Sequence, residues 1–279
     1  MKIKALTPLY GIFGNPVRHS LSPLIHNTLF KEAGINARYL AFEPSSIQEA
    51  IKAMRTFKMP GASITIPYKI EALDFIDAID PLAQKIGSIN TLQNSDGIIK
   101  GYNTDGWGAL LALKNKNINV DNVSILIIGN GGSARAIAFT LLEKKALIYL
   151  AGRNKEKIKI LAKNLKKNQP KSFVDTILLE NLSSDFMTKI DIIINTTPIG
   201  MEPNIDKTPL PSTLIQAHHK VFDIIYAPQK TLLLRQSLEK KCLTIPGLDM
   251  LVYQALKQFE IWTGQKMNPK SVYKALANL

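Results

Sequence analysis

Short apolar runs alternate with amphipathic stretches along the whole chain, and this alternation predicts an α/β protein in which helices connect parallel strands. The spacing of apolar residues changes from a period of two in the runs to a helical period between them. The runs predict strands at residues 6–13, 38–42, 62–66, 123–129, 146–151, 173–178, 191–195 and 221–225, and a hairpin over 89–102 that turns at Asp96 and Gly97.

Several helix starts are marked by hydroxyl, acidic and proline residues. Ser22, followed by Pro23 at the first helical position, predicts a helix whose first turn is capped by the serine hydroxyl. Ser46 and Glu49 form a capping box ahead of a helix over 47–57. Further helices are expected after Tyr68, over 105–115, from the glycine turn to 144, within the exposed Lys- and Asn-rich stretch 153–171, and twice after 247, the second beginning at Asn268 and Pro269.

Composition narrows the class of protein. The chain of 279 residues is 46% hydrophobic, which predicts a globular protein of one or two domains with a sizeable core. Its 35 Lys and Arg against 22 Asp and Glu give a net charge of +13, but the lysines are dispersed and no aromatic-rich nucleic-acid motif accompanies them. A solvated basic surface is therefore favoured over a nucleic-acid site.

Cysteine content and apolar run lengths bear on the compartment. The single Cys242 cannot form an intrachain disulfide or a zinc motif, which favours a reducing environment. Pro8, Gly11 and Gly14 interrupt the apolar N-terminal stretch, so it is interpreted as a strand and not as a signal peptide. No apolar run reaches about 18 residues, so no membrane span is expected. A cytoplasmic protein without a membrane partner is the resulting prediction.

The segment GNGGSA follows an apolar strand and opens an apolar helix, as a dinucleotide-binding loop requires. An NAD site usually has an acidic residue at the end of the next strand, whereas here Arg153 occupies that place and could hold a 2′-phosphate, so NADP is favoured. The residues assigned to the cofactor are Gly129, Asn130, Gly131, Gly132, Ser133 and Ala134 in the loop, and Gly152, Arg153, Asn154 and Lys157 after the next strand.

Two serines near the N-terminus are candidates for binding an anion. Ser20 and Ser22 lie just before the helix that Pro23 starts, where free amides and the helix dipole favour a small carboxylate. Helix capping alone would account for Ser22 but not for Ser20.

Four further polar residues leave strands at positions from which their side chains can converge. They are Thr65 and Lys69 in GASITIPYK, Asn90 in GSINTL and Asp105 in GYNTDG. A free lysine is almost wholly protonated at neutral pH, so Lys69 is suited to donate a proton, and Asp105 nearby would hold it in the charged form. The four histidines show no metal-ligand spacing, and no metal is expected; His19 and His26 are expected to pack around the first helix, and His218 and His219 to lie in a surface loop.

The ordered motifs SLSP, ITIPYK, INTL, NTDG, GNGGSA, NTTPIGM, DIIYAP and GLDMLVYQA run almost from end to end, and on them the chain closely resembles the shikimate dehydrogenase family. The resemblance implies NADP-dependent reduction of 3-dehydroshikimate to shikimate, in aromatic amino-acid biosynthesis. It implies that residues 1–104, completed by C-terminal helices over 248–279, form a substrate-binding α/β domain with a mixed sheet. Residues 105–247 would form a Rossmann-type domain with a doubly wound parallel sheet, and a cleft would separate the two.

The resemblance also implies a role for each matching site residue. Ser20 and Ser22 would bind the substrate carboxylate, Lys69 would be the acid–base residue, and Tyr226 would line the substrate pocket. The residues implied to hold the substrate hydroxyls are Thr65, Asn90, Asp105 and Gln254, and those implied to touch the cofactor include Ile224 and Gly247. The implied partners are the small-molecule substrate and NADP, in a monomer or homodimer.

This chain departs from the family pattern at two places. The family often has Asn-Arg-Thr at the adenosine ribose, where this chain has Gly152, Arg153 and Asn154. Asp249 stands where many relatives have a small residue, and the sequence gives no physical reason for it. Three alternatives stay open: a quinate/shikimate dehydrogenase that uses NAD, a non-catalytic metabolite-binding protein on the same fold, and a basic nucleic-acid binder.

Overall fold

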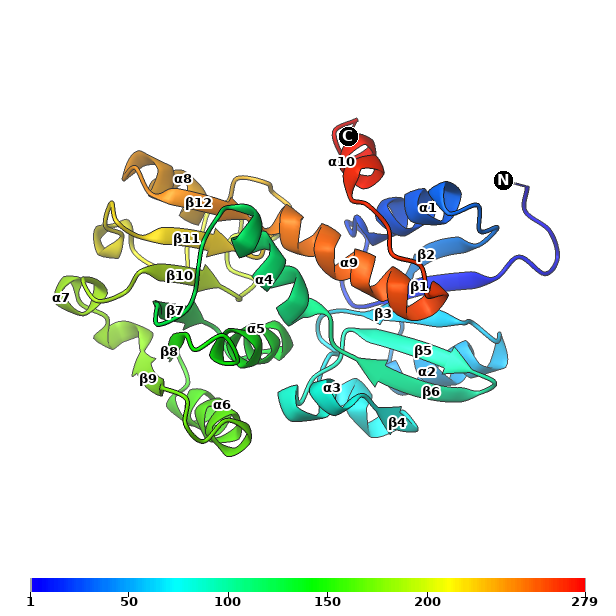
Figure 1. Ribbon diagram of the computed structural model, residues 1–279, viewed down its shortest axis with the longest axis horizontal. Helices are drawn as coiled ribbons and strands as arrows, with labels where there is room; N and C mark the ends of the chain where they lie inside the picture. The colour runs from blue at the N-terminus through cyan, green and yellow to red at the C-terminus, as the bar shows by residue number, and fades with distance from the viewer. Residues whose placement is uncertain (1, 279) are drawn as a thin grey trace. The chain divides into compact units, whose positions relative to one another are not determined.

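The structure is a computed structural model that describes residues 2–278, and the chain forms two compact units (Figure 1). The first unit contains the described residues up to Asp105 together with those from Val252 onward. The second unit is Gly106–Leu251. The first unit is therefore built from two separate stretches of chain.

The first unit contains a mixed sheet. Its strand order is β2 (Arg38–Phe42), β1 (Leu9–Phe13), β3 (Gly61–Ile64), β5 (Thr91–Ser95), β6 (Ile98–Tyr102) and β4 (Ala78–Ile79). Strands β1, β2 and β3 run parallel, β5 is antiparallel to both β3 and β6, and β4 is parallel to β6. The expected hairpin is present: Asp96 and Gly97 both have positive φ, 53° and 90°, as a two-residue hairpin turn requires. The mixed sheet predicted for this part of the chain is confirmed.

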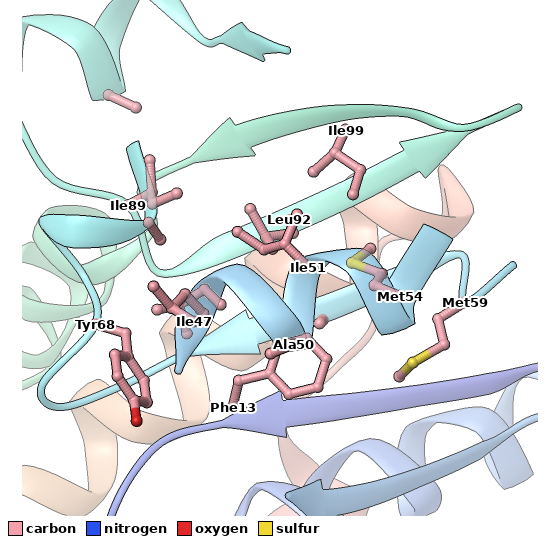
Figure 2. Packing of buried hydrophobic residues seen from close by; sticks show 14 residues of the cluster. Phe13, Ile47, Ala50, Ile51, Met54, Met59, Tyr68, Ile89, Leu92 and Ile99 are labelled. Carbon is pink, nitrogen blue, oxygen red and sulfur yellow. The ribbon is translucent and has the colours of Figure 1, made fainter. Parts of the chain in front are cut away.

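Helix α2 (Ile47–Thr56) packs on one face of this sheet (Figure 2). Ile47, Ala50, Ile51 and Met54 recur at helical spacing and form one buried stripe, which meets Leu92 and other residues of the sheet. The predicted cap is also present, because the Ser46 hydroxyl accepts the amide of Glu49 at 3.2 Å.

Helix α9 (Gly247–Thr263) covers the opposite face with its later turns. Neighbouring strand residues point to opposite faces, and Ala62 belongs to the α2 core while Gly61 faces α9. A Cβ atom on Gly61 would lie 2.4 Å from the indole nitrogen of Trp262, so only glycine fits under this ring. The remaining helices of this unit are α1 (Ser22–Glu32), the short 3-10 helix η1 (Glu71–Phe75), α3 (Pro81–Ile86) and α10 (Lys270–Leu276).

The second unit contains an all-parallel sheet. Its order is β12 (Leu243–Pro246), β11 (Lys220–Asp223), β10 (Ile192–Asn195), β7 (Ser124–Ile128), β8 (Leu147–Gly152) and β9 (Val174–Leu178). The order reverses between β7 and β10, which is the switch point at which doubly wound sheets bind ligands. Connecting elements are α4 (Asp105–Asn115), α5 (Gly132–Leu142), α6 (Lys155–Asn168), η2 (Leu179–Asn181), α7 (Ser184–Met187), η3 (Ser212–Leu214) and α8 (Leu232–Glu239). The predicted α/β class and doubly wound sheet are confirmed.

Some predicted elements differ from the structure. The first strand begins at Leu9, not at residue 6, and the residues after Tyr68 form the 3-10 helix η1. The sequence patterns also missed β4, α3 and β12, all of which are six residues or shorter.

The predicted capping role of Ser22 is wrong. The N-cap residue of α1 is Leu21, which forms no side-chain capping hydrogen bond. Instead, the amide of Ser22 donates to the hydroxyl of Ser20 at 3.2 Å, so the upstream serine receives the amide at this helix start. Within residues 2–278, no helix is both long and apolar enough to cross a membrane.

Candidate active site

Polar side chains of the first unit gather at one edge of its sheet. The carboxyl ends of β1 and β3 lie together because these strands are parallel. The start of β5 lies at the same edge, since Thr91 pairs with Ser63 of β3 and with Tyr102 at the end of β6. Thr65, Asn90 and the segment 103–105 therefore lie at one edge, as the sequence predicted.

Lys69 and Asp105 form the charged centre of this edge. The ammonium group of Lys69 donates a hydrogen bond to Asp105 Oδ2, and the two side chains are 14% and 4% exposed. The main chain holds Lys69 near the strand edge, because its carbonyl accepts the amide of Ile89 at 2.8 Å. Asn90 Nδ2 donates to Asp105 Oδ1 at 2.8 Å. Each carboxylate oxygen of Asp105 thus has a donor.

Asn90 connects this pair to the rest of the cluster. Its Nδ2 also lies 2.8 Å from Thr104 Oγ1 and 3.2 Å from Gln254 Oε1, while its Oδ1 accepts the amide of Thr104 at 2.9 Å. Asn90 and Gln254 are buried, at 2% and 7% exposure. Lys69, Asn90, Asp105 and Gln254, four residues singled out in the sequence, are therefore brought together in one hydrogen-bonded cluster.

The sequence patterns gave no role to Asn103 and Thr104, which complete the cluster. Asn103 Oδ1 accepts the amide of Asp105 at 3.0 Å, at the first turn of α4. Its Nδ2 donates to the carbonyl and the hydroxyl of Ser88, at 2.9 and 3.0 Å. The signal for both residues was the run of three polar residues Asn-Thr-Asp directly after a strand.

The remaining predicted substrate residues of the first unit lie after β3 and at the start of α1. Thr65 directly follows β3, and its amide donates to the carbonyl of Phe13 at 3.0 Å. A Cβ atom on Gly14 would lie 2.2 Å from the Thr65 methyl group, so glycine lets this methyl pack against the main chain. Ser20 and Ser22 lie at the start of α1, where Ser22 is buried and Ser20 partly buried.

In the second unit, the loop over 129–134 leaves β7 at the switch point. Gly129 has φ +123°, and its amide donates to Ala151 of the neighbouring strand β8. A Cβ atom on it would lie 2.3 Å from Thr196 Oγ1, so this turn needs glycine. Gly131 is the N-cap of α5, and a Cβ atom there would meet no atom within 4 Å. Ala134 is fully buried.

This loop fits a dinucleotide pyrophosphate. The open space beside Gly131 leaves its backbone accessible, and Gly131 is followed directly by the N-terminal turn of α5, where the helix dipole favours an anion. Asn130 precedes Gly131 and is partly buried. The chain thus provides the tight turn, the close approach and the small helix residue that a dinucleotide loop needs.

The segment after β8 carries the residues predicted to select NADP. Arg153 is exposed at the strand end. Asn154 is the N-cap of α6, and its Oδ1 accepts the amide of Lys157 at 3.0 Å. A Cβ atom on Gly152 would lie 2.8 Å from Ile158 Cγ2. A cavity of about 250 Å³ opens beside this segment, lined by Lys155, Ile158, Thr176, Ile177, Leu178 and Asn181.

Ile224, Tyr226 and Gly247 lie after the ends of β11 and β12. A Cβ atom on Gly247 would lie 2.2 Å from the Ile224 carbonyl oxygen, so only glycine lets α9 begin this close to the Ile224 backbone. Ile224 and Tyr226 are partly buried.

Asp223, which the sequence patterns did not single out, holds the segment that follows β11 in place. It is fully buried and accepts hydrogen bonds from Asn195 Nδ2 at 3.0 Å, the amide of Ile225 at 3.1 Å and Thr231 Oγ1 at 2.7 Å. Burial raises the pKa of Asp223 to about 6. The available signal was a single polar residue at the end of each apolar strand, in IIIN and KVFD.

Two of the four histidines, His26 and His219, are buried. His26 is fully buried, stacks on Tyr39 with ring centroids 4.4 Å apart, and packs as predicted within the first unit. The surface-loop prediction is wrong for His219, which is fully buried with its Nε2 3.0 Å from the Met187 carbonyl. Across the residues that the structure describes, no group of three or more His, Cys, Asp or Glu side chains could hold a metal ion.

Comparisons with family models match three consecutive segments of the chain. Residues 12–92 match the shikimate dehydrogenase substrate binding domain, residues 111–225 match shikimate / quinate 5-dehydrogenase, and residues 247–277 match the shikimate 5′-dehydrogenase C-terminal domain.

Individual relatives match over almost the whole chain. The chain is 40% identical to a shikimate dehydrogenase (NADP(+)) of Methanocaldococcus jannaschii over 277 residues, which cover 98% of both chains. It is 42% identical to that of Pyrococcus furiosus over 95% of this chain and 93% of the relative. A solved shikimate dehydrogenase in complex with NADP+ superimposes with a TM-score of 0.92 at 40% identity, over 99% of this chain and 97% of that one.

Proposed function

This chain belongs to the shikimate dehydrogenase family, and we propose that the cluster of Lys69, Asn90, Asp105 and Gln254 is its substrate-binding and proton-transfer site. The protein is an oxidoreductase, an NADP-dependent shikimate dehydrogenase of the shikimate pathway. Its reaction is the reversible reduction of 3-dehydroshikimate to shikimate, which feeds aromatic amino-acid biosynthesis. The observation that carries the proposed site is the buried Lys69–Asp105 pair at the end of the sheet.

The proton of this reaction is assigned to Lys69. NADPH, when bound, supplies the hydride. Lys69 Nζ donates a proton to the oxygen of the reduced ketone, and in the oxidation direction it takes the proton back. Asp105 Oδ2 holds the ammonium group in place and compensates its charge in the buried site. Because Asp105 Oδ1 is held by Asn90, the carboxylate has a fixed orientation relative to Lys69.

The other polar residues of the first unit are assigned to substrate binding. Ser20 and Ser22 would bind the carboxylate at the start of α1, where the positive end of the helix dipole favours an anion. Thr65, Asn90, Asp105 and Gln254 would hold the hydroxyl groups, and Tyr226 would be a further substrate-contacting residue, as the family resemblance implies.

The second unit is assigned to the cofactor. The open space at Gly131 and the N-terminus of α5 support pyrophosphate binding. Arg153 would bind the 2′-phosphate, since its exposed guanidinium stands where an NAD site usually has an acid. Asn154 and Lys157 flank it, and Ile224 and Gly247 would approach the nicotinamide end. The proposed division of labour is a substrate domain of residues 1–104 and 248–279 and a cofactor domain of 105–247.

The test is a steady-state assay of cofactor reduction with shikimate and NADP, repeated with NAD and with quinate. Turnover with shikimate and NADP that exceeds every other pairing supports the proposal. Preference for quinate and NAD would favour the quinate/shikimate alternative, and absence of turnover with every pairing would favour a metabolite-binding protein.

We further propose a cytoplasmic monomer or homodimer without nucleic-acid or membrane partners. Gel filtration, together with DNA and RNA retention at two salt concentrations, tests that assignment.

A further inference from the structure

The orientation of the Asn90 carboxamide decides what faces Asp105. In the observed orientation its Nδ2 donates to Asp105 Oδ1. The reverse orientation would put the Asn90 carbonyl oxygen against a carboxylate oxygen, and two acceptors repel each other. The geometry of the Lys69–Asp105 pair therefore depends on whatever holds this carboxamide.

Thr91 holds the oxygen end of the carboxamide. Its hydroxyl donates to Asn90 Oδ1 at 2.7 Å, next to the amide of Thr104 at 2.9 Å. Thr91 is fully buried, so no solvent competes for this hydroxyl. Two donors on Oδ1 leave Nδ2 as the end that faces Asp105.

Gln258 sets the direction of the Thr91 hydroxyl. Gln258 Nε2 donates to Thr91 Oγ1 at 3.0 Å and to the main-chain carbonyl of Asn90 at 2.9 Å. A hydroxyl has one hydrogen, so a Thr91 oxygen that accepts from Gln258 directs its own hydrogen to Asn90 Oδ1. The Asn90 carbonyl is only an acceptor, and this fixes which end of the Gln258 amide is the NH2 group.

The other end of Gln258 is held by the interior of the first unit. Gln258 Oε1 accepts from Ser63 Oγ at 2.9 Å and lies 3.2 Å from His26 Nε2, and Ser63 in turn accepts from the Tyr39 hydroxyl at 2.6 Å. Burial lowers the pKa of His26 to about 3, so its ring is neutral near neutral pH. Because Gln258 Oε1 can only accept, the contact with it assigns the ring hydrogen to Nε2. Gln258 is 1% exposed, and both hydrogens of its Nε2 are used.

We propose that Thr91 and Gln258 are positioning residues for proton transfer: they orient Asn90, which orients Asp105, which holds Lys69. Neither side chain is assigned a contact with substrate or cofactor. The proposal rests on the proposed roles of Lys69 and Asp105. It adds two buried residues of the first unit to those assigned a role in the reaction. One of them, Gln258, lies one turn after Gln254 on α9.

The test compares Thr91→Val with Thr91→Ser. Valine keeps the branched shape but removes the hydroxyl, so Asn90 Oδ1 loses one donor and Gln258 Nε2 loses one acceptor. We expect kcat for shikimate oxidation to fall about tenfold, the effect of one lost positioning hydrogen bond. The KM for NADP should stay within about twofold, because the proposed cofactor residues lie on other elements. Thr91→Ser should restore kcat to within about twofold of wild type.

Ser63→Ala is the matched control, because it removes a buried hydrogen bond to Gln258 but leaves both Nε2 contacts in place. It should lower the thermal midpoint by an amount similar to Thr91→Val while retaining kcat. Gln258→Met removes the hydrogen bonds that Gln258 Nε2 donates to Thr91 Oγ1 and to the Asn90 carbonyl. It should lower kcat at least as far as Thr91→Val. If Thr91→Val fails to fold, Gln258→Met against Ser63→Ala decides by the same criterion.

Three outcomes overturn the proposal: Thr91→Val with wild-type kcat, Ser63→Ala with an equal loss of kcat, or Thr91→Ser without rescue. Lys69→Ala, assayed beside them, separates this proposal from the proposed function. Loss of turnover in Lys69→Ala with wild-type turnover in Thr91→Val refutes only the positioning relay. Normal turnover in Lys69→Ala refutes the proposed proton-transfer role, and the relay with it.

Discussion

Lys69 and Asp105 form an ion pair that is almost fully withdrawn from solvent, with side chains 14% and 4% exposed. Taking two charges out of water is unfavourable, so such a pair is retained where its charges are used or where every partner is satisfied. Here both carboxylate oxygens have donors, from Lys69 and from Asn90. A buried ammonium group held in one position is suited to deliver a proton to a substrate oxygen.

Replacement of Lys69 by alanine should therefore abolish most of the turnover. We expect kcat to fall by roughly 10²- to 10⁴-fold, the usual contribution of general acid–base catalysis, with a modest change in the KM for shikimate. Steady-state kinetics in both directions measures this. Lys52→Ala, an exposed lysine of α2, is the matched control and should keep wild-type rates. Near wild-type turnover in Lys69→Ala would exclude it as the proton donor.

Arg153 should govern the choice between NADP and NAD. Removing its guanidinium in Arg153→Ser takes away the proposed bidentate partner of the 2′-phosphate. The KM for NADP should rise by about tenfold or more, while that for NAD should change little, because NAD has no phosphate there. Parallel titrations with the two cofactors test this. An equal rise for both would show that Arg153 does not read the phosphate.

Gly131 and Gly129 should respond differently to alanine. A Cβ atom on Gly131 meets nothing within 4 Å, so Gly131→Ala should fold with an unchanged thermal midpoint but bind NADP more weakly. Gly129 has φ +123° and would place a Cβ atom 2.3 Å from Thr196 Oγ1, so Gly129→Ala should lower the midpoint as well. Thermal melts with and without NADP distinguish the two variants. Unchanged NADP affinity in Gly131→Ala would contradict the proposed pyrophosphate site.

Asp223 should make the second unit more stable in mild acid. Burial raises its pKa from 3.8 to about 6, so between these values the folded state binds a proton that the unfolded state has released. Its contribution to the free energy of unfolding therefore falls as pH rises from about 4 to 6, by up to about 3 kcal/mol, and is constant above that range. Asp223→Asn lacks this titration.

Denaturant unfolding of both proteins across pH 4 to 7 gives the readout for Asp223. The stability of wild type relative to Asp223→Asn should increase as the pH is lowered. A difference that is independent of pH would mean that Asp223 does not titrate in this range.

The sequence predicted the elements whose signals are local. The strand over 38–42 and the helix over 105–115 have the predicted bounds, because apolar periodicity and polar ends mark both. The missed strands β4 and β12 have two and four residues, too few for a period to be recognised, and only pairing with a neighbouring strand makes them strands. Ser22 has the residue type and position of a cap, yet the fold gives the acceptor role to Ser20.

Local patterns predicted the centre of the site, because polar residues there lie next to strands. Lys69 follows β3, Asn90 directly precedes β5 and Asp105 follows β6, and the structure joins all three. Gln258 carries no such signal, because an amide in the middle of a helix is usually solvated. Its role depends on a strand far away in sequence, and no local pattern encodes that contact.

The division of the first unit into two stretches of chain has a consequence for biosynthesis. The carbonyl of Asn90 accepts from a side chain 168 positions later, and Gly61 leaves space for an indole ring that arrives later still. During translation the strands of this unit therefore emerge long before the helix that satisfies their polar groups and covers one face. The second unit is therefore complete in the nascent chain before the first, and the first unit can complete its fold only after its C-terminal helices have been translated.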